Sequence, residues 1–240
     1  MNNLQGKTIL ITGAARRVGK IFALACAKAG ADVIIHHGHS HEEALEVKKE
    51  IASFGRSAWV LTFDLSNTKN VSQLISKANK LSPLYAIVNS ASIFEPLSFK
   101  ETTLDDWNKH FDINLTTPFL LSQAFAKQRK KGRILNILDW RALRPGADHF
   151  PYTITKSALA AMTKSLAIAL APNIIVNGLA MGAILPPSDK PSKSKKIIEN
   201  VPAQRWAETK EVEEALIFLL TCPEYITGEI LHLDGGRHLV

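Results

Sequence analysis

A tyrosine and a lysine four residues apart are candidates for proton-transfer chemistry. Tyr152 and Lys156 belong to the segment YTITK, and a helix places side chains at this spacing on one face. A nearby ammonium group stabilises a phenolate, which lowers the pKa of a tyrosine from about 10 and makes it a workable proton donor near neutral pH. Such pairs also occur by chance on many helices, so the surrounding residues must decide.

An aspartate is predicted to converge on this pair. Asp139 lies thirteen residues before Tyr152 and follows a predicted strand, from which it could reach the same cleft. The alternative is that Asp139 forms a surface ion pair with Arg141 or Arg144.

Asn114 is the fourth polar candidate. It lies in a helical pattern four residues before Pro118, and proline lacks the N–H that would bond to the Asn114 carbonyl. We hypothesise that this carbonyl holds a water molecule in contact with Lys156, which opens a proton route to solvent. The alternative is a simple helix kink.

A glycine-containing turn predicts a dinucleotide site near the start of the chain. A predicted strand runs into the segment TGAARRVGK, which leads into an Ala-rich helix. Gly13 allows a sharp turn, Gly19 allows close packing, and the helix start offers N–H groups to a pyrophosphate. The residues expected to contact the cofactor here are Gly13, Arg16, Arg17, Val18 and Gly19.

The end of the second predicted strand indicates which dinucleotide binds. The segment HHGHS has no acidic residue to bind a ribose 2′-hydroxyl. Arg17, His37 and Ser40 can instead supply charge and hydrogen bonds to a 2′-phosphate, which predicts NADPH. The alternative is that Arg17 is a solvated surface residue and the histidines only end the strand.

Further candidates follow the third and fourth predicted strands, whose carboxyl ends are where open α/β sheets bind ligands. These cofactor-binding candidates are Asp64, Leu65, Asn89 and Ala91. Asp64 could alternatively be only a turn former, and Asn89 a hydrogen-bonded core residue.

Seven short runs rich in β-branched residues must position these side chains. They span 7–12, 32–36, 58–63, 85–89, 133–138, 174–177 and 230–233, with amphipathic or Ala-rich stretches between them. This alternation predicts a doubly wound, Rossmann-type parallel sheet with helices on both faces. Ser40 with Glu43 predicts a capping box, Thr209 is predicted to cap a later helix, and Gly30 follows the first helix.

The chain is expected to form one domain over residues 1–240, with one long irregular segment at about 180–207. Prolines at 186, 187, 191 and 202 prevent a continuous helix there. A loop of this length in a compact domain is usually functional, so we expect a substrate lid.

Composition excludes several classes of protein. The formal net charge is +7, but the basic residues are scattered apart from residues 190–196, and no nucleic-acid-binding motif accompanies them. No apolar run approaches the roughly 20 residues of a membrane span, and no signal-peptide pattern opens the chain, so we expect a cytoplasmic protein. Cys26 and Cys222 lack metal-ligand spacing and are expected to be buried thiols.

Taken together, the motifs resemble those of the short-chain dehydrogenase/reductase family over nearly the whole chain. The motifs are the glycine turn from Thr12 to Gly19, Asn89-x-Ala91-Ser92, Asn114, Tyr152-x-x-x-Lys156 and Asp234-Gly235-Gly236. The resemblance implies that Tyr152 is the general acid, that Lys156 orients the nicotinamide ribose and lowers the tyrosine pKa, and that Asn114 completes a proton relay. It also implies a homotetramer.

Two departures from the family pattern resemble the pteridine reductases and dihydromonapterin reductases. Most family members carry serine where this chain has Asp139 and glycine where it has Arg17, and the terminal segment DGGRHL adds to the likeness. The resemblance implies that Asp139 helps to protonate ring nitrogens and that Phe94 stacks on a pterin. The expected substrate-binding residues are Arg17, Phe94, Asp139 and Tyr152.

We therefore predict NADPH-dependent reduction of a dihydropterin to its tetrahydro form. Reducing a C=N bond requires a proton on nitrogen, which a carboxyl group can help to deliver. One alternative is a ketone reductase that acts on acyl, sugar or other carbonyl compounds. Another is a catalytically idle regulator that binds NADPH.

Overall fold

A seven-stranded parallel sheet forms the centre of the protein, as a computed structural model describes it for residues 3–186 and 194–240. The strand order is β3-β2-β1-β4-β5-β6-β7, and every neighbouring pair is parallel. The strands are β1 (Thr8–Ile11), β2 (Asp32–His37), β3 (Ala58–Thr62), β4 (Leu84–Asn89), β5 (Gly132–Asp139), β6 (Ile174–Met181) and β7 (Ile230–Leu233). The predicted fold class is confirmed.

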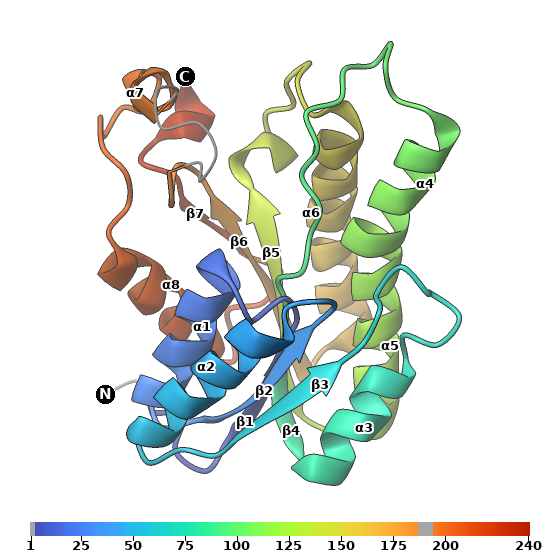
Figure 1. Ribbon diagram of the computed structural model, residues 1–240, viewed down its shortest axis with the longest axis vertical. Coiled ribbons are helices and arrows are strands. Elements are labelled where there is room, and N and C mark those ends of the chain that lie inside the picture. Colours follow the sequence, from blue (N-terminus) through green and yellow to red (C-terminus); the bar gives the residue numbers. More distant parts are fainter. Residues whose placement is uncertain (1–2, 187–193) are drawn as a thin grey trace.

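Helices cover both faces of this sheet (Figure 1). One face carries α1 (Arg17–Lys28), α2 (His41–Ser53) and α8 (Thr209–Thr221). The other carries α3 (Gln73–Leu81), α5 (Thr117–Gln128) and α6 (Phe150–Leu170), with α4 (Leu104–Phe111) packed on α6. The short helix α7 (Ser194–Glu199) precedes α8. Because all strands run the same way, the side chains at their carboxyl ends meet at one edge.

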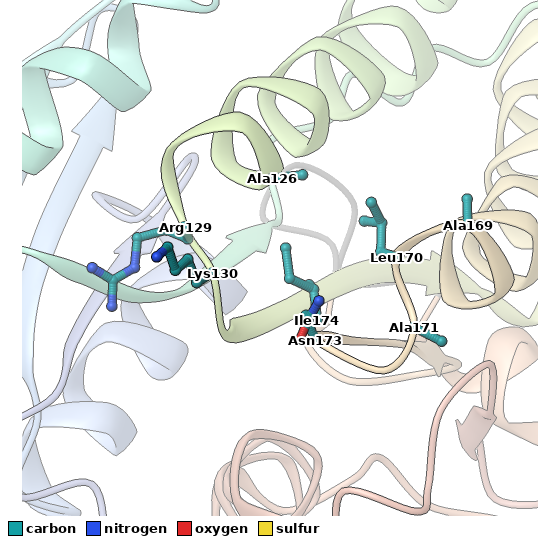
Figure 2. A pocket seen from close by; sticks show the side chains of 8 residues that line it. All are labelled: Ala126, Arg129, Lys130, Ala169, Leu170, Ala171, Asn173 and Ile174. Atoms are coloured by element: carbon teal, nitrogen blue, oxygen red, sulfur yellow. The ribbon is translucent and has the colours of Figure 1, made fainter.

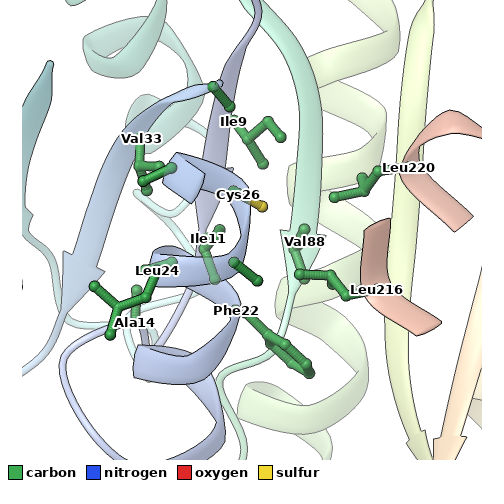
Figure 3. Close-up of a cluster of buried hydrophobic side chains, with 14 of the residues drawn as sticks. Ile9, Ile11, Ala14, Phe22, Leu24, Cys26, Val33, Val88, Leu216 and Leu220 are labelled. Carbon is green, nitrogen blue, oxygen red and sulfur yellow. The ribbon is translucent and has the colours of Figure 1, made fainter. Parts of the chain in front are cut away.

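The helix α1 anchors the first of these faces (Figure 3). Phe22 is fully buried and packs in one apolar cluster with Val88 of β4 and Leu216 of α8. Small residues along α1 let the helix approach the sheet closely. Burying a side chain of this size contributes roughly 1.5–3 kcal/mol, so α1 holds the preceding glycine turn firmly against the sheet.

The structure corrects several predicted element boundaries. The strand β6 continues to Met181, so the irregular segment begins later than predicted, and residues 187–193 of the predicted lid lie outside the described residues. Ser40 precedes α2 but its side chain makes no capping bond, and the Glu43 carboxylate pairs with Arg16 rather than closing a capping box. The cap of α8 is Glu208 rather than Thr209.

The predictions for Gly30 and for the two cysteines are confirmed. Gly30 follows α1 and adopts a positive φ of 97°. Both cysteines are buried and carry free thiols. Within the described part of the chain, no helix is long and apolar enough to cross a membrane.

Candidate active site

Tyr152 and Asp139 meet at the carboxyl edge of the sheet. Asp139 is the last residue of β5, and Tyr152 lies in the first turn of α6. The Tyr152 hydroxyl donates a hydrogen bond of 3.1 Å to an oxygen of Asp139, and only 7% of Tyr152 is exposed. The predicted convergence of these two residues is therefore present.

The local electrostatics differ from those expected for Tyr152. Burial, followed by the negative charge of Asp139, raises the pKa of Tyr152 well above its usual value. The net shift is thus opposite to the one expected from Lys156 alone, and the contribution of the Lys156 charge to the pKa of Tyr152 stays a prediction. Tyr152 thus keeps its proton at neutral pH, as a proton donor must.

Lys156 is buried one turn further along α6. Its ammonium donates a hydrogen bond of 2.8 Å to the Ile137 carbonyl and lies 5.6 Å from the centre of the Tyr152 ring. Burial lowers the pKa of Lys156 to about 8, against the opposing effect of Asp139. A modest rise in pH above neutrality therefore removes this charge from the site.

Asp139 forms an ion pair with Arg141 as well as its contact with Tyr152, so both interpretations of Asp139 apply. The Arg141 guanidinium lies 3.6 Å from Asp139 and 2.6 Å from Asp148, and its backbone N–H donates to Asp139 over 2.9 Å. Asp139 therefore contacts Tyr152 with one oxygen and Arg141 with the other. The ion pair holds the carboxylate in place instead of drawing it away from Tyr152.

Phe94 forms an aromatic wall at the mouth of the site. The edge of the Tyr152 ring packs against it at a centroid distance of 4.6 Å. The His149 imidazole stacks on it, with centroids 3.9 Å apart and planes only 7° apart. Phe94 remains 51% exposed, so this wall is accessible to a planar ligand.

Asn114 connects two of these elements. It lies in the π-helical turn η1 (Asp112–Thr116), just before Pro118. Its side-chain oxygen accepts bonds from the Ile93 N–H (2.9 Å) and the Ser92 hydroxyl (3.0 Å), and its amide donates to Thr155 of α6 (3.2 Å). The side chain thus ties the segment that carries Phe94 to the helix that carries Lys156. The water relay predicted at its backbone carbonyl stays a prediction.

The turn between β1 and α1 has the features of a phosphate cradle. A Cβ atom at Gly19 would lie 2.0 Å from the Gly13 carbonyl oxygen, so the turn closes only because that position is glycine. The residue that precedes α1, Arg16, makes no side-chain cap, and no acidic residue lies in the first turn. The N–H groups at this helix start are therefore free of side-chain caps, which suits a pyrophosphate.

Two residues brace this cradle. The Thr12 hydroxyl accepts bonds from the backbone N–H groups of Ser90 (2.9 Å) and Ala91 (3.0 Å). The His36 imidazole accepts a bond of 3.2 Å from the Gly13 N–H. Sequence reasoning missed His36, whose signal would have been its place at the end of β2.

The two arginines of the turn point in different directions. Arg16 pairs with Glu43 on α2, whereas the guanidinium of Arg17 donates a bond of 3.3 Å to the Pro186 carbonyl, beyond β6. Arg17 has a positive φ of 49°. In this structure Arg16 lies on the side of α2, and the contact of Arg17 with a ribose phosphate stays a prediction.

His37 and Ser40 lie at the end of β2, as predicted. Ser40 keeps its hydroxyl free of any capping bond. His37 is buried, and its Nε2 lies 3.0 Å from the Thr62 hydroxyl and 3.3 Å from Nδ1 of His41. Its Nδ1 has no partner among the described residues. Val18, next to the cradle, is partly buried against the core.

The side chains of the candidate residues after β3 and β4 mainly contact other residues of the protein. Asp64 accepts two bonds from Ser66 and so forms a turn, and Leu65 is buried in the core. The Asn89 amide points inward and donates a bond of 2.8 Å to Asn136. Asp64 thus fits the alternative of a turn former, and Asn89 fits that of a hydrogen-bonded core residue. A contact between these segments and the cofactor would therefore come from their backbone.

Figure 2 shows the side chains that line one cavity, which lies at the edge of the sheet opposite to Asp139. Its volume is about 350 Å³, and it opens where β6 begins. It is lined by Ala126, Arg129, Lys130, Ala169, Leu170, Ala171, Asn173 and Ile174. Asp139 and Tyr152 lie at the carboxyl ends of the strands, so this cavity is separate from the candidate site.

Comparison with known proteins connects this geometry to a family. The family model described as enoyl-(acyl carrier protein) reductase matches residues 13–238. The chain is 32% identical to the 3-oxoacyl-[acyl-carrier-protein] reductase of Synechocystis sp., over 98% of each protein. It is 30% identical to the 5-keto-D-gluconate 5-reductase of Escherichia coli, over 98% of this chain and 96% of that protein.

A solved structure gives a further likeness. The FolM alternative dihydrofolate reductase 1 from Brucella canis, in complex with NADP, superposes with a TM-score of 0.93 and 32% identity, covering 100% of this chain and 97% of the other. These names differ in substrate, so they do not fix the substrate of this chain. They agree on the family, because model and relatives match along almost the whole sequence. The chain belongs to the short-chain dehydrogenase/reductase family of oxidoreductases.

Proposed function

We propose that this protein uses NADPH to reduce a dihydropterin, such as dihydromonapterin, dihydrobiopterin or dihydrofolate, to its tetrahydro form. The observation that carries the proposal is the hydrogen bond of 3.1 Å between Tyr152 and Asp139. A C=N bond gains a hydride on carbon and a proton on nitrogen, and a carboxyl group beside the tyrosine can help to deliver that proton. The likeness to a Brucella dihydrofolate reductase complexed with NADP supports both substrate and cofactor.

The residues divide the work as follows. Tyr152 holds the proton, and Asp139 accepts its hydrogen bond and can pass a proton toward a ring nitrogen. The Lys156 charge favours the phenolate that develops as Tyr152 donates. Phe94 is 51% exposed, and a planar pterin that stacks on it would take the place that the His149 ring occupies in this structure. NADPH, when bound, supplies the hydride.

The cofactor would lie across the cradle between β1 and α1. The free N–H groups at the start of α1 would hold its pyrophosphate, and Arg16, His37 and Ser40 would face the ribose phosphate. A Cβ at Gly19 would push the Gly13 carbonyl out of position, which explains why the cradle needs glycine there.

Reduction of a ketone is the second candidate. It is favoured by the relatives named 3-oxoacyl-[acyl-carrier-protein] reductase and 5-keto-D-gluconate 5-reductase. Tyr152 with Lys156 could protonate a carbonyl oxygen without Asp139. On this reading the Arg141 ion pair would be the main role of Asp139.

The test is NADPH oxidation with dihydromonapterin, dihydrobiopterin and dihydrofolate beside a panel of ketones, for the wild type and Asp139→Ser. We expect turnover of pterins and a larger loss on pterins than on ketones in the variant. Turnover of ketones alone would replace the substrate assignment. Tight NADPH binding without turnover of any substrate would favour an idle regulator.

A further inference from the structure

An arginine from the C-terminal turn lies close to this site without an acidic partner. The guanidinium of Arg237 stands over the Trp140 ring, 4.4 Å from its centre. Among the described residues, the Arg237 side chain makes no ion pair and no hydrogen bond, whereas Arg141, 4.7 Å from the same ring, pairs with Asp139 and Asp148. Arg237 is partly buried, and a partly buried cation favours an anionic partner.

The C-terminal turn is built to hold this arginine in place. The buried carboxylate of Asp234 accepts bonds from the N–H of Gly236 (3.0 Å) and from the N–H and imidazole of His238 (2.9 and 2.8 Å). Gly236 adopts a φ of 85° and packs against Pro202. These contacts fix the backbone on both sides of Arg237, so the turn η4 (Arg237–Leu239) presents its first side chain in a defined direction.

Arg237 lies beside the candidate site rather than on a remote part of the surface. Trp140 directly follows Asp139, and the turns η2 (Trp140–Ala142) and η4 contact each other. Both stand at the carboxyl edge of the sheet (Figure 1). Burial, and then the positive charge of Arg141, lower the pKa of Arg237. Two guanidinium groups held at one indole ring repel each other, and a bound anion would relieve that repulsion.

We propose that Arg237 binds a carboxylate on the side chain of the substrate while the ring of the substrate lies against Phe94 and Asp139. This inference rests on the proposed function. It narrows the substrate class to dihydropterins whose side chain ends in an acid, as in dihydrofolate, over those with a neutral side chain, such as dihydromonapterin. The planar fork of arginine suits a carboxylate, with which it can form two parallel hydrogen bonds.

The test compares KM and kcat for dihydrofolate and dihydromonapterin in three variants. Arg237→Met removes the charge but keeps an apolar stem on Trp140, and Arg237→Lys keeps a charge. Arg144→Gln is the matched control, because Arg144 is exposed on the loop after η2. Thermal unfolding of each variant verifies that the C-terminal turn is intact.

We expect Arg237→Met to raise KM for dihydrofolate roughly tenfold or more, the size of one charge-assisted hydrogen bond. KM for dihydromonapterin and both kcat values should stay near those of the wild type, Arg237→Lys should recover part of the loss, and Arg144→Gln should change neither substrate. An equal rise in KM for both pterins would show that Arg237 only supports Trp140, and no change would also overturn the inference. If the wild type reduces neither pterin, the proposed function itself fails.

Discussion

The Tyr152 hydroxyl donates its hydrogen bond to Asp139, over 3.1 Å, and not to a neutral hydroxyl. This partner has two effects. The negative charge of Asp139 adds to burial in raising the pKa of Tyr152, and the carboxylate is a second group that can carry a proton. The pair is thus suited to protonate a substrate rather than to remove a proton from one.

Removing either member of this pair should slow the chemical step. We expect Tyr152→Phe to lower kcat by roughly 10²- to 10⁴-fold, the usual contribution of a general acid. The dissociation constant of NADPH should change little, because the cradle between β1 and α1 is untouched. Single-turnover kinetics and equilibrium titration with NADPH measure the two quantities separately, and full activity of the variant would refute the assigned acid.

The charge of Asp139 has a spectroscopic consequence. In Asp139→Asn, the negative charge that faces the Tyr152 hydroxyl is gone, so the pKa of Tyr152 should fall relative to the wild type. The chain has three tyrosines, and the tyrosinate absorbance of Tyr152 is the difference between each protein and its Tyr152→Phe counterpart in an alkaline titration. Coincident difference curves for the wild type and Asp139→Asn would contradict this reading of the pair.

Lys156 should make the reaction sensitive to mild alkali. Its pKa is lowered to about 8 by burial, so the ammonium is charged below that pH and neutral above it. Since the charge favours the phenolate that forms as Tyr152 donates, kcat should fall as the pH rises through about 8. Lys156→Met, neutral at every pH, should be slow throughout and should lack this limb. A wild-type rate that stays flat across this range would sink the assignment.

The strands were predictable from the sequence because each is a short, largely apolar run, and most of these runs are buried. The boundary of β6 was not, since Asn177 and Gly178 interrupt the apolar run although the strand continues to Met181. The cap of α2 failed for another reason. Glu43 fits the capping pattern locally, but Arg16, distant in sequence, binds its carboxylate.

The candidate site was also only partly predictable, because some of its contacts join residues that are distant in sequence. The sequence predicted that Tyr152 and Asp139 lie together, because Asp139 follows a predicted strand and Tyr152 opens the next long helix. The stack of His149 on Phe94 depends on a left-handed residue at the start of α6, which no spacing rule encodes. Arg237 and Trp140 are far apart in the sequence, and only the folded turn after β7 brings them into contact.

The glycine cradle gives a prediction that compares two glycines. A methyl group at Gly19 would lie 2.0 Å from the Gly13 carbonyl oxygen, whereas one at Gly38 would meet no atom within 4 Å. We expect Gly19→Ala to lower the free energy of unfolding by about 1–3 kcal/mol, as overpacking does, and to weaken NADPH binding. Gly38→Ala should leave the free energy of unfolding nearly unchanged. Denaturant unfolding of both variants tests this, and equal stability would mean that the turn adapts.

Cofactor selectivity should depend on Arg16 more than on Arg17, because only Arg16 reaches the α2 side of the cradle. We expect Arg16→Gln to weaken NADPH binding roughly tenfold, the effect of losing one charge-assisted hydrogen bond to the 2′-phosphate. NADH lacks that phosphate, so its dissociation constant should barely change. Arg17→Gln is the matched control, and the ratio of the two dissociation constants should stay near that of the wild type.

Substitution of Glu43 should have the opposite effect on NADPH binding. The Glu43 carboxylate pairs with Arg16 and would compete with the 2′-phosphate for that guanidinium. Glu43→Gln should therefore tighten NADPH binding while leaving NADH unaffected, and raising the salt concentration should shrink the difference because salt screens exposed charges. Titrating each variant with both dinucleotides measures these constants directly. If Arg17→Gln alone removed the preference for NADPH, Arg17 would leave the Pro186 carbonyl when the cofactor binds and contact the 2′-phosphate, as the sequence predicts.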